Sequence, residues 1–278
     1  MNVQKRVLSV QDISCFGKCA NTVALPVQSA AGHECVVLPT ALLSTHTGGF
    51  VGYSFLDLTD EMQKILNHWK TLDLPFDAVQ TGYFGSLTQL QILKDYIRDY
   101  VSPDAFLCVD PVMGDRGRLY SIYDDAFVAG MREFVRGADV ITPNMTESCL
   151  LCDVPYTDQE DLATVEACLK GFERLGVKRA VLTGVHFPGN QTGVAAVDFT
   201  TGQKRTMRTP RLEGYLHGTG DVFSSSLCAL MLRDLPFMDA VKGALDFTFA
   251  AIQATDSVRE QYGLCFESVL WMLTEKNT

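Results

Sequence analysis

The chain has no apolar run of about 18 residues, the length that a membrane-crossing helix needs, so no membrane span is expected. It also has no internal repeat, no low-complexity tract and no linker rich in Pro, Gly or Ser. No domain boundary is therefore visible along the sequence. We expect residues 1–278 to form a single domain, since α/β sheets with helices on both faces commonly reach this length as one unit.

Positive charge is scarce as well. The chain has 23 Lys and Arg residues against 33 Asp and Glu residues, a formal net charge of -10, and a sequence pI of about 4.9. A nucleic-acid surface needs a basic stripe, and this composition argues against one. An anionic nucleotide would need a local site that is positive or rich in N–H groups.

The cysteines do not form a disulfide or zinc pattern. There are nine, an odd number, at irregular spacing, and no second pair lies at zinc-site distance from Cys149 and Cys152. The first residues lead straight into a short apolar stretch instead of a signal-peptide core. We therefore expect reduced thiols in a cytoplasmic protein, with Cys149 and Cys152 as packing residues on a helix.

Two nucleotide-binding motifs are missing. No Gly-x-x-x-x-Gly-Lys-[Ser/Thr] loop is present, and no Gly-x-Gly-x-x-Gly opens the first helix. The run Leu216-His217-Gly218-Thr219-Gly220-Asp221-Val222-Phe223 offers another architecture, because small residues precede Asp221 and apolar residues at helical spacing follow it. The N–H groups of such a turn and the positive end of the helix favour an anion, most simply a phosphoryl group.

Asp221 indicates what chemistry this turn could support. A carboxylate repels phosphate, so it does not help simple phosphate capture. It fits a site where it takes a proton from a hydroxyl group that attacks phosphorus. The alternative is an ordinary Gly-containing turn with an acidic residue at a helix start.

Short apolar runs alternate with amphipathic ones along the rest of the chain, which predicts a mostly parallel sheet with helices on both faces. The expected strands are Val7–Gln11, Cys35–Pro39, Ala78–Thr81, Phe106–Asp110, Val140–Thr142, Ala180–Thr183 and Gly193–Phe199. The expected helices are Ala20–Ala31, Asp60–Thr71, Thr88–Tyr100, Asp124–Arg136, Thr146–Cys152, Asp158–Leu175, Asp221–Leu232, Phe237–Glu260 and Phe266–Lys276.

Polar residues follow most of the expected strands. In parallel sheets the ligand lies beyond the carboxyl ends of the strands, so these residues are candidates for its site. They are Gln11-Asp12, 44–47, 81–83, Asp110-Pro111, 142–144, Thr183-Gly184 and the turn 216–221. Among them, Asp110 and Glu147 are the best candidates for direct or water-mediated contact with Mg²⁺, which takes one or two carboxylates and keeps several waters. For Glu147 the alternative is favourable charge in a first helical turn.

Together these residues resemble the ribokinase superfamily and, within it, the pyridoxal (vitamin B6) kinases. The matching segments run nearly end to end: 8–11, 44–48, 81–86, 110–114, 142–147 and 218–221. The resemblance implies a ribokinase-like three-layer α/β/α sandwich with a mostly parallel central sheet. It also implies ATP-dependent phosphorylation of the 5′-hydroxymethyl group of pyridoxal, pyridoxamine or pyridoxine, with Mg²⁺, and leaves open whether K⁺ assists. A homodimer is a family expectation.

The resemblance also implies residue roles. Asp221 would be the general base, and the N–H groups of Gly218, Thr219 and Gly220 would form the anion hole for the phosphoryl group. The substrate side would include Gln11, Asp12, His46, Thr47 and Tyr83, with Thr47 on the ring substituents, Tyr83 over the ring and His46 either orienting loop 44–48 or touching the ring. The nucleotide side would include Asp110, Asp115, Asn144, Glu147 and Thr183. Segment 115–120, with two arginines, is similar to a flap that closes over ATP.

One departure concerns Asp12, because pyridoxal kinases usually have Ser directly after the first-strand Gln. A carboxylate here could pair with a protonated ring nitrogen or with the ammonium group of pyridoxamine. We therefore hypothesise that Asp12 shifts preference towards pyridoxamine; the alternative is a turn residue that never touches substrate.

Two other functions share these features. A hydroxymethylpyrimidine kinase of thiamin synthesis has the same fold and terminal motif, although segments 44–48 and 81–83 favour vitamin B6. A non-catalytic B6-binding protein is the alternative of another class, and the presence of both Asp221 and Glu147 argues against it.

Overall fold

The computed structural model describes residues 4–157, 162–212, 216–256 and 260–274. Its internal contacts divide the chain into two compact units. The first comprises residues 1–106 and 212–278, and the second comprises residues 107–211. The single domain expected from the sequence stays a prediction.

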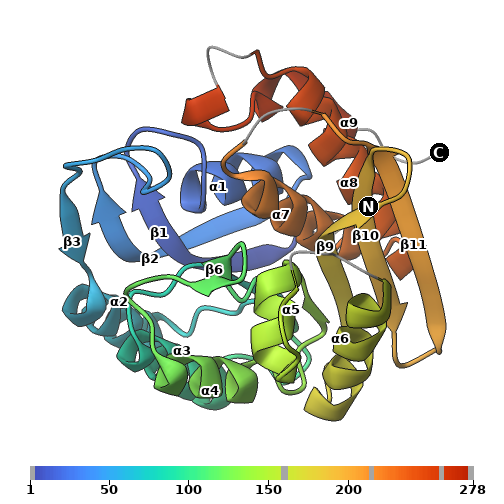
Figure 1. The fold of residues 1–278 in the computed structure, drawn as a ribbon. Coiled ribbons are helices and arrows are strands. Elements are labelled where there is room, and N and C mark those ends of the chain that lie inside the picture. The colour runs from blue at the N-terminus through green and yellow to red at the C-terminus, as the bar shows by residue number, and fades with distance from the viewer. Residues whose placement is uncertain (1–3, 158–161, 213–215, 257–259, 275–278) are drawn as a thin grey trace. The chain divides into compact units, whose positions relative to one another are not determined.

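The first unit contains the strand order β4-β1-β2-β3. Strand β1 pairs in parallel with β4 and β2, and the short edge strand β3 runs antiparallel to β2. Helices α1, α7 and α8 cover one face and α2 and α3 the other (Figure 1). The elements are β1 (Arg6–Ser14), α1 (Asn21–Ala30), β2 (Glu34–Leu43), β3 (Phe55–Asp57), α2 (Thr59–Leu72), β4 (Ala78–Thr81), α3 (Leu87–Tyr100), α7 (Thr219–Met231), α8 (Phe237–Gln253), two 3-10 helices (Glu260–Tyr262 and Phe266–Val269) and α9 (Trp271–Thr274).

The second unit contains the strand order β11-β10-β9-β8-β5. The β5–β8 and β8–β9 pairs are parallel, and β10 runs antiparallel to both of its neighbours. A separate antiparallel hairpin, β6–β7, lies between β5 and α4 in the chain, and β6 is labelled in Figure 1. The elements are β5 (Phe106–Val109), β6 (Gly114–Asp115), β7 (Arg118–Leu119), α4 (Asp125–Phe134), β8 (Val140–Ile141), α5 (Met145–Cys152), α6 (Leu162–Leu175), β9 (Arg179–Phe187), β10 (Gln191–Asp198) and β11 (Gln203–Pro210).

The expected α/β fold with a mostly parallel sheet and helices on both sides is confirmed. Strand β11 was not expected, because only Met207 and Thr209 are buried in its charged sequence. Such charge is typical of an edge strand, and it hides the apolar alternation by which strands are recognised.

Two expected helices were too long. Helix α8 ends at Gln253, and the expected helix Phe266–Lys276 is a 3-10 turn followed by α9. The first four residues of the expected helix Asp158–Leu175 lie outside the described residues, as do the last two of Phe266–Lys276. In the described part of the chain, none of the helices combines the length and the apolar character needed to cross a membrane.

A buried polar network lies under α7. The Gln28 amide on α1 donates to Gln80 Oε1 on β4 at 2.8 Å, and the Gln80 amide donates to Ser225 Oγ on α7 at 2.8 Å. Buried side-chain hydrogen bonds of this kind require one relative placement of the groups that make them. The network therefore fixes how α7, and the turn at its start, lies against β4 and α1.

Candidate active site

The glycine turn starts α7 as the sequence predicts. Gly218 is the N-cap and has a left-handed backbone with φ 79°. A Cβ at this position would lie 2.2 Å from the backbone oxygen of Lys18, so the turn requires a residue without one. The backbone of α7's first turn thus lies directly against the segment between β1 and α1.

Asp221 is the third residue of α7 and is partly buried. Burial raises its pKa to about 7, and the nearby carboxylate of Asp12 adds to this, while the backbone N–H of Ala20 donates to it and acts in the opposite direction. A carboxyl group with a pKa near neutrality is suited to accept a proton from a hydroxyl group.

Asp12 lies inside β1, not beyond its end. The strand continues to Ser14, and its register against β2 shifts between Gln11 and Ile13. Such irregularities re-aim side chains and are frequent beside active sites. Asp12 is buried, its carboxylate accepts a hydrogen bond from Ser14 Oγ at 3.0 Å, and burial raises its pKa to about 6.

Tyr83 belongs to the same group of residues. It follows β4, its backbone oxygen accepts a hydrogen bond from Thr40 Oγ1 at 2.9 Å, and it is partly buried. Burial raises the pKa of its hydroxyl group, and the Asp12 carboxylate is the next cause. The first unit therefore brings Asp12, Tyr83, Asp221 and the glycine turn into one neighbourhood.

His46 holds the loop that follows β2. Its Nδ1 accepts the Gly48 N–H at 3.1 Å, which leaves Nε2 to donate to the Gln261 backbone oxygen at 2.9 Å. Both ring nitrogens are occupied, and burial lowers the pKa of the ring, so the neutral form is favoured. His46 also packs on His217 with ring centroids 4.9 Å apart, next to the glycine turn. These contacts favour the loop-orienting role; Thr47, beside it, is exposed.

The Gln11 side chain points into the protein. It is 1% exposed and donates to Ser9 Oγ at 3.0 Å. Asn21 completes this group, since its amide donates to the Gln11 backbone oxygen at 2.7 Å and its Oδ1 accepts from Ser9 Oγ at 2.7 Å. Sequence reasoning missed Asn21, which ties the start of α1 to β1. A substrate contact by Gln11 stays a prediction.

In the second unit, Asn144 and Glu147 form a capping box at the start of α5. Asn144 Oδ1 accepts the Glu147 N–H, and Glu147 Oε2 accepts the Asn144 N–H, both at 2.9 Å. Glu147 Oε1 accepts the Met113 N–H at 3.1 Å. Burial raises the pKa of Glu147 in spite of these N–H donors. Glu147 therefore lies in the first turn of α5, as the alternative reading of favourable charge requires, and it also caps the helix.

The same unit offers oxygen ligands for Mg²⁺. Asp110 and Glu147 are buried carboxylates, and Thr142 Oγ1 is buried without a hydrogen-bond partner. Hard oxygen donors of this kind fit Mg²⁺, which needs only one or two carboxylates. In the described residues no group of three or more His, Cys, Asp or Glu side chains forms a metal cage.

Thr183 and Asp115 complete the predicted nucleotide side. Thr183 pairs with Asn144 in an isolated parallel bridge, at a point where the β9–β10 register shifts. Asp115 ends β6, and the turn to β7 has Arg116 at φ 51° and Gly117 at φ 74°, typical of a tight hairpin. The Gly117 N–H donates to Thr146 Oγ1 at 2.8 Å, which ties the predicted flap to α5.

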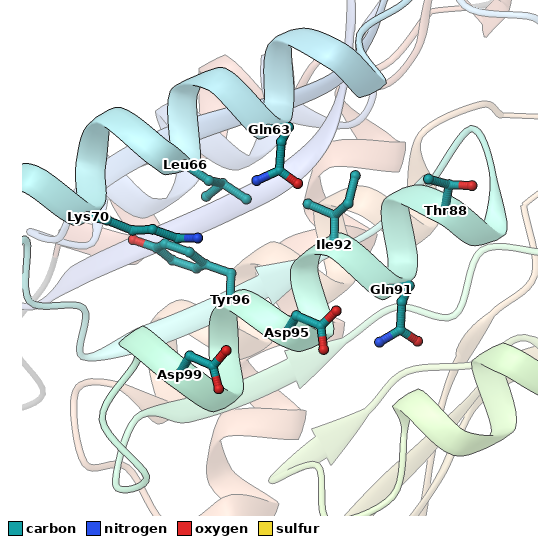
Figure 2. A pocket seen from close by; sticks show the side chains of 9 residues that line it. All are labelled: Gln63, Leu66, Lys70, Thr88, Gln91, Ile92, Asp95, Tyr96 and Asp99. Atoms are coloured by element: carbon teal, nitrogen blue, oxygen red, sulfur yellow. The ribbon is translucent and has the colours of Figure 1, made fainter.

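A cavity of about 200 Å³ lies elsewhere, between α2 and α3 (Figure 2). None of the predicted site residues lines it. Its side chains are Gln63, Leu66, Lys70, Thr88, Gln91, Ile92, Asp95, Tyr96 and Asp99.

The Gly218 contact generates a test. We expect Gly218→Ala to destabilise the protein, because the new methyl group would displace the Lys18 carbonyl. Gly32→Ala is the matched control: its φ is 91° and a Cβ there meets nothing within 4 Å, so only backbone strain of about 1 kcal/mol applies. Thermal unfolding of both variants measures the difference, and equal shifts would contradict the proposed close contact.

A family model and several solved structures of kinases are similar to this chain. Residues 26–265 match the family model for phosphomethylpyrimidine kinase. A provisionally assigned phosphomethylpyrimidine kinase from Bacteroides thetaiotaomicron, crystallised with pyridoxal, is 36% identical, with a TM-score of 0.92 over 98% of this chain and 96% of its own. Pyridoxal kinase from Lactobacillus plantarum is 32% identical, with a TM-score of 0.87 over 98% and 97%.

A third structure carries both ligands of such an enzyme. Pyridoxal kinase from Leishmania donovani, in complex with ADP and pyridoxamine, is 26% identical, with a TM-score of 0.87 over 99% of this chain and 97% of its own. The resemblance to pyridoxal kinases noted from the sequence is confirmed, and phosphotransfer of the pyridoxal kinase or hydroxymethylpyrimidine kinase kind is the activity that these relatives share. The chain belongs to the phosphomethylpyrimidine kinase family, in the ribokinase superfamily.

Proposed function

We propose that this protein transfers the γ-phosphoryl group of ATP to the 5′-hydroxymethyl group of B6 vitamers, with Asp221 as the general base. The observation that carries the proposal is Asp221 itself: a carboxyl group of near-neutral pKa in the first turn of α7, beside the N–H groups of a glycine turn. Relatives crystallised with pyridoxal and with ADP and pyridoxamine support the choice of ligands.

The reaction needs few groups. Asp221 accepts the proton of the substrate's hydroxymethyl group. The hydroxymethyl oxygen at the same time forms a bond to the γ-phosphorus. The bond from that phosphorus to the bridging oxygen breaks, and ADP leaves with the electron pair. The N–H groups of Gly218, Thr219 and Gly220 would stabilise the charge on the transferring group, assisted by the positive end of α7.

The second unit would serve the nucleotide. Asp110 and Glu147 would hold Mg²⁺, and Asn144 would bind the phosphate oxygens. Thr183 would line the nucleotide side of the site. When bound, Mg²⁺ would neutralise charge on the phosphates. Because both Glu147 oxygens already accept N–H groups, Glu147 is suited to water-mediated contact with Mg²⁺.

The second candidate is a hydroxymethylpyrimidine kinase, favoured by the family model that matches residues 26–265. Its substrate also presents a hydroxymethyl group on a nitrogen heterocycle, so the same base and anion hole would serve. Segments 44–48 and 81–83 favour the pyridine substrate by their resemblance to the vitamin B6 kinases.

The test compares ADP release with Mg-ATP on pyridoxal, pyridoxamine, pyridoxine and hydroxymethylpyrimidine. We expect turnover on the B6 vitamers, and Asp221→Asn should lower kcat by about 10²–10⁴-fold, as loss of a general base does. Asp239→Asn, in the first turn of α8, is the matched control and should not lower kcat.

Turnover only on the pyrimidine would select the second candidate, and no turnover on any of the four compounds would favour a non-catalytic binding protein. A loss below fivefold in Asp221→Asn would remove Asp221 from the role of base.

Glu147 supplies a test of the metal site. In Glu147→Gln the one remaining oxygen can still accept the Asn144 N–H, but the negative charge is removed and an amide N–H₂ replaces the oxygen that accepts the Met113 N–H. We expect the Mg²⁺ concentration for half-maximal rate to rise several-fold. Glu173→Gln, on the exposed side of α6, is the control. An unchanged Mg²⁺ titration would argue against metal contact.

Asp12 supplies a test of vitamer choice. Its buried carboxylate near Asp221 and Tyr83 is suited to the ammonium group of pyridoxamine. We expect Asp12→Ser to lower the ratio of kcat/KM for pyridoxamine to that for pyridoxal by about tenfold, which corresponds to one hydrogen bond to a charged group. Removing Asp12 also alters the base Asp221, but this affects both vitamers, so the ratio isolates recognition. Asp60→Asn, which is exposed on α2, is the control, and an unchanged ratio in Asp12→Ser would disprove the hypothesis.

A further inference from the structure

His217 directly precedes the glycine turn and is half-buried. Its imidazole ring lies on the backbone of Gly48, in the loop that follows β2: a Cβ on Gly48 would lie 2.2 Å from His217 Cε1 and 2.3 Å from His217 Nδ1. The backbone of Gly48 does not have a positive φ, so other residues could adopt its conformation. The His217 ring is therefore what excludes a side chain from this position.

The same ring contacts a second residue of this short loop. The rings of His217 and His46 lie 4.9 Å apart, measured between centroids, and are tilted by 41°. His46 Nδ1 in turn accepts the Gly48 N–H at 3.1 Å. His217 thus contacts both residues that flank Thr47. Thr47 itself is exposed, so its position depends on how its two neighbours are held.

Gln261 holds the loop as well. Its backbone oxygen lies 2.9 Å from His46 Nε2, and its side-chain amide donates to the Gly49 backbone oxygen at 2.9 Å. Loop 46–49 is therefore held by Gln261 and His217 together. Of these two residues, only His217 belongs to the segment that carries the glycine turn, so it is the one that joins the loop to that turn.

The loop and the turn have different tasks in the proposed function. Thr47 would contact the substituents of the pyridine ring, whereas the glycine turn would hold the phosphoryl group that is transferred to the hydroxymethyl group of the same molecule. A small, rigid substrate can reach both only if their separation is fixed.

We propose that His217 is a positioning residue that sets this separation: its ring fills the space over Gly48 and keeps Thr47 in place relative to the glycine turn. The inference rests on the proposed function, because that function assigns the loop and the turn to one substrate. It gives a role to a residue that acts through Gly48 and His46.

A size swap tests the inference. His217→Ala empties the space over Gly48, and Gly48→Ala places a methyl group where the ring now lies. We expect each variant to raise KM for the preferred B6 vitamer by about tenfold, while kcat changes less than about threefold and KM for ATP stays unchanged, because the loop moves and Asp221 does not. In Gly48→Ala/His217→Ala the methyl group meets no ring, so KM should be no higher than in His217→Ala.

Gly48→Ala/His68→Ala is the matched control, since His68 is an exposed histidine on α2, and it should keep the full defect of Gly48→Ala. A KM about a hundredfold above that of the wild-type protein in Gly48→Ala/His217→Ala, the product of two independent effects, would overturn the inference. A fall in kcat with an unchanged KM in His217→Ala would also overturn it, because a purely structural role lowers only the amount of active protein.

Failure of the proposed function is visible separately, in the wild-type protein. Turnover of hydroxymethylpyrimidine alone would overturn the choice of B6 vitamers, and the same variants measured on that substrate would still decide the role of His217. If the wild-type protein turns over none of these compounds, the variants are compared by their Kd for pyridoxal. Equal Kd values in all variants would then overturn the inference, and a wild-type protein that binds no pyridoxal would overturn both proposals.

Discussion

The close approach of the Lys18 carbonyl to Gly218 is the constraint on which the site in the first unit depends. It brings the start of α7 against the segment that leads into α1, at a distance that no side chain on Gly218 would permit. Gly263 meets the same segment, since a Cβ there would lie 2.7 Å from the Lys18 oxygen, and the Lys18 N–H donates to the Tyr262 oxygen at 2.8 Å. Segments from three distant parts of the sequence are thus held together by backbone contacts, which do not depend on the conformations of long side chains.

This arrangement places two carboxyl groups close together in a buried region, where burial disfavours their ionised form. Asp12 and Asp221 both have raised pKa values, about 6 and about 7 against 3.8 in the open chain. A carboxyl group whose pKa is higher in the folded state binds more protons there than in the unfolded state. Its contribution to stability therefore falls as pH rises from about 4 to about 7. The positive end of α7 and the Ala20 N–H offset part of this cost. A protein that only held an anion would gain nothing from such a pair, whereas a base needs a pKa in this range.

Much of this could be predicted from the sequence, because the signals were local. The glycine turn, the acidic residue in the first turn of α7, and the pair Asn144 and Glu147 at the start of α5 all have short-range sequence patterns that indicate their backbone geometry. What failed depends on tertiary contacts. Charge on the exposed face of β11 concealed a strand, and the inward direction of Gln11 follows from its bond to Ser9. The positive φ of Ala20, 46°, had no sequence signal, because nothing in the identity of alanine indicates such a backbone.

Asp12 and Thr183 combine a local sequence signal with a feature that depends on tertiary contacts. Each is a polar residue inside an apolar strand, and each lies where the register of that strand shifts against a neighbour. The extra residue lies on β2 at the first of these shifts and on β9 itself at the second. Neither shift ends the strand, since β1 continues to Ser14 and β9 to Phe187. Both residues were expected at strand ends, whereas the strands continue past them, and such irregularities allow one strand to contribute both to the core and to a candidate site.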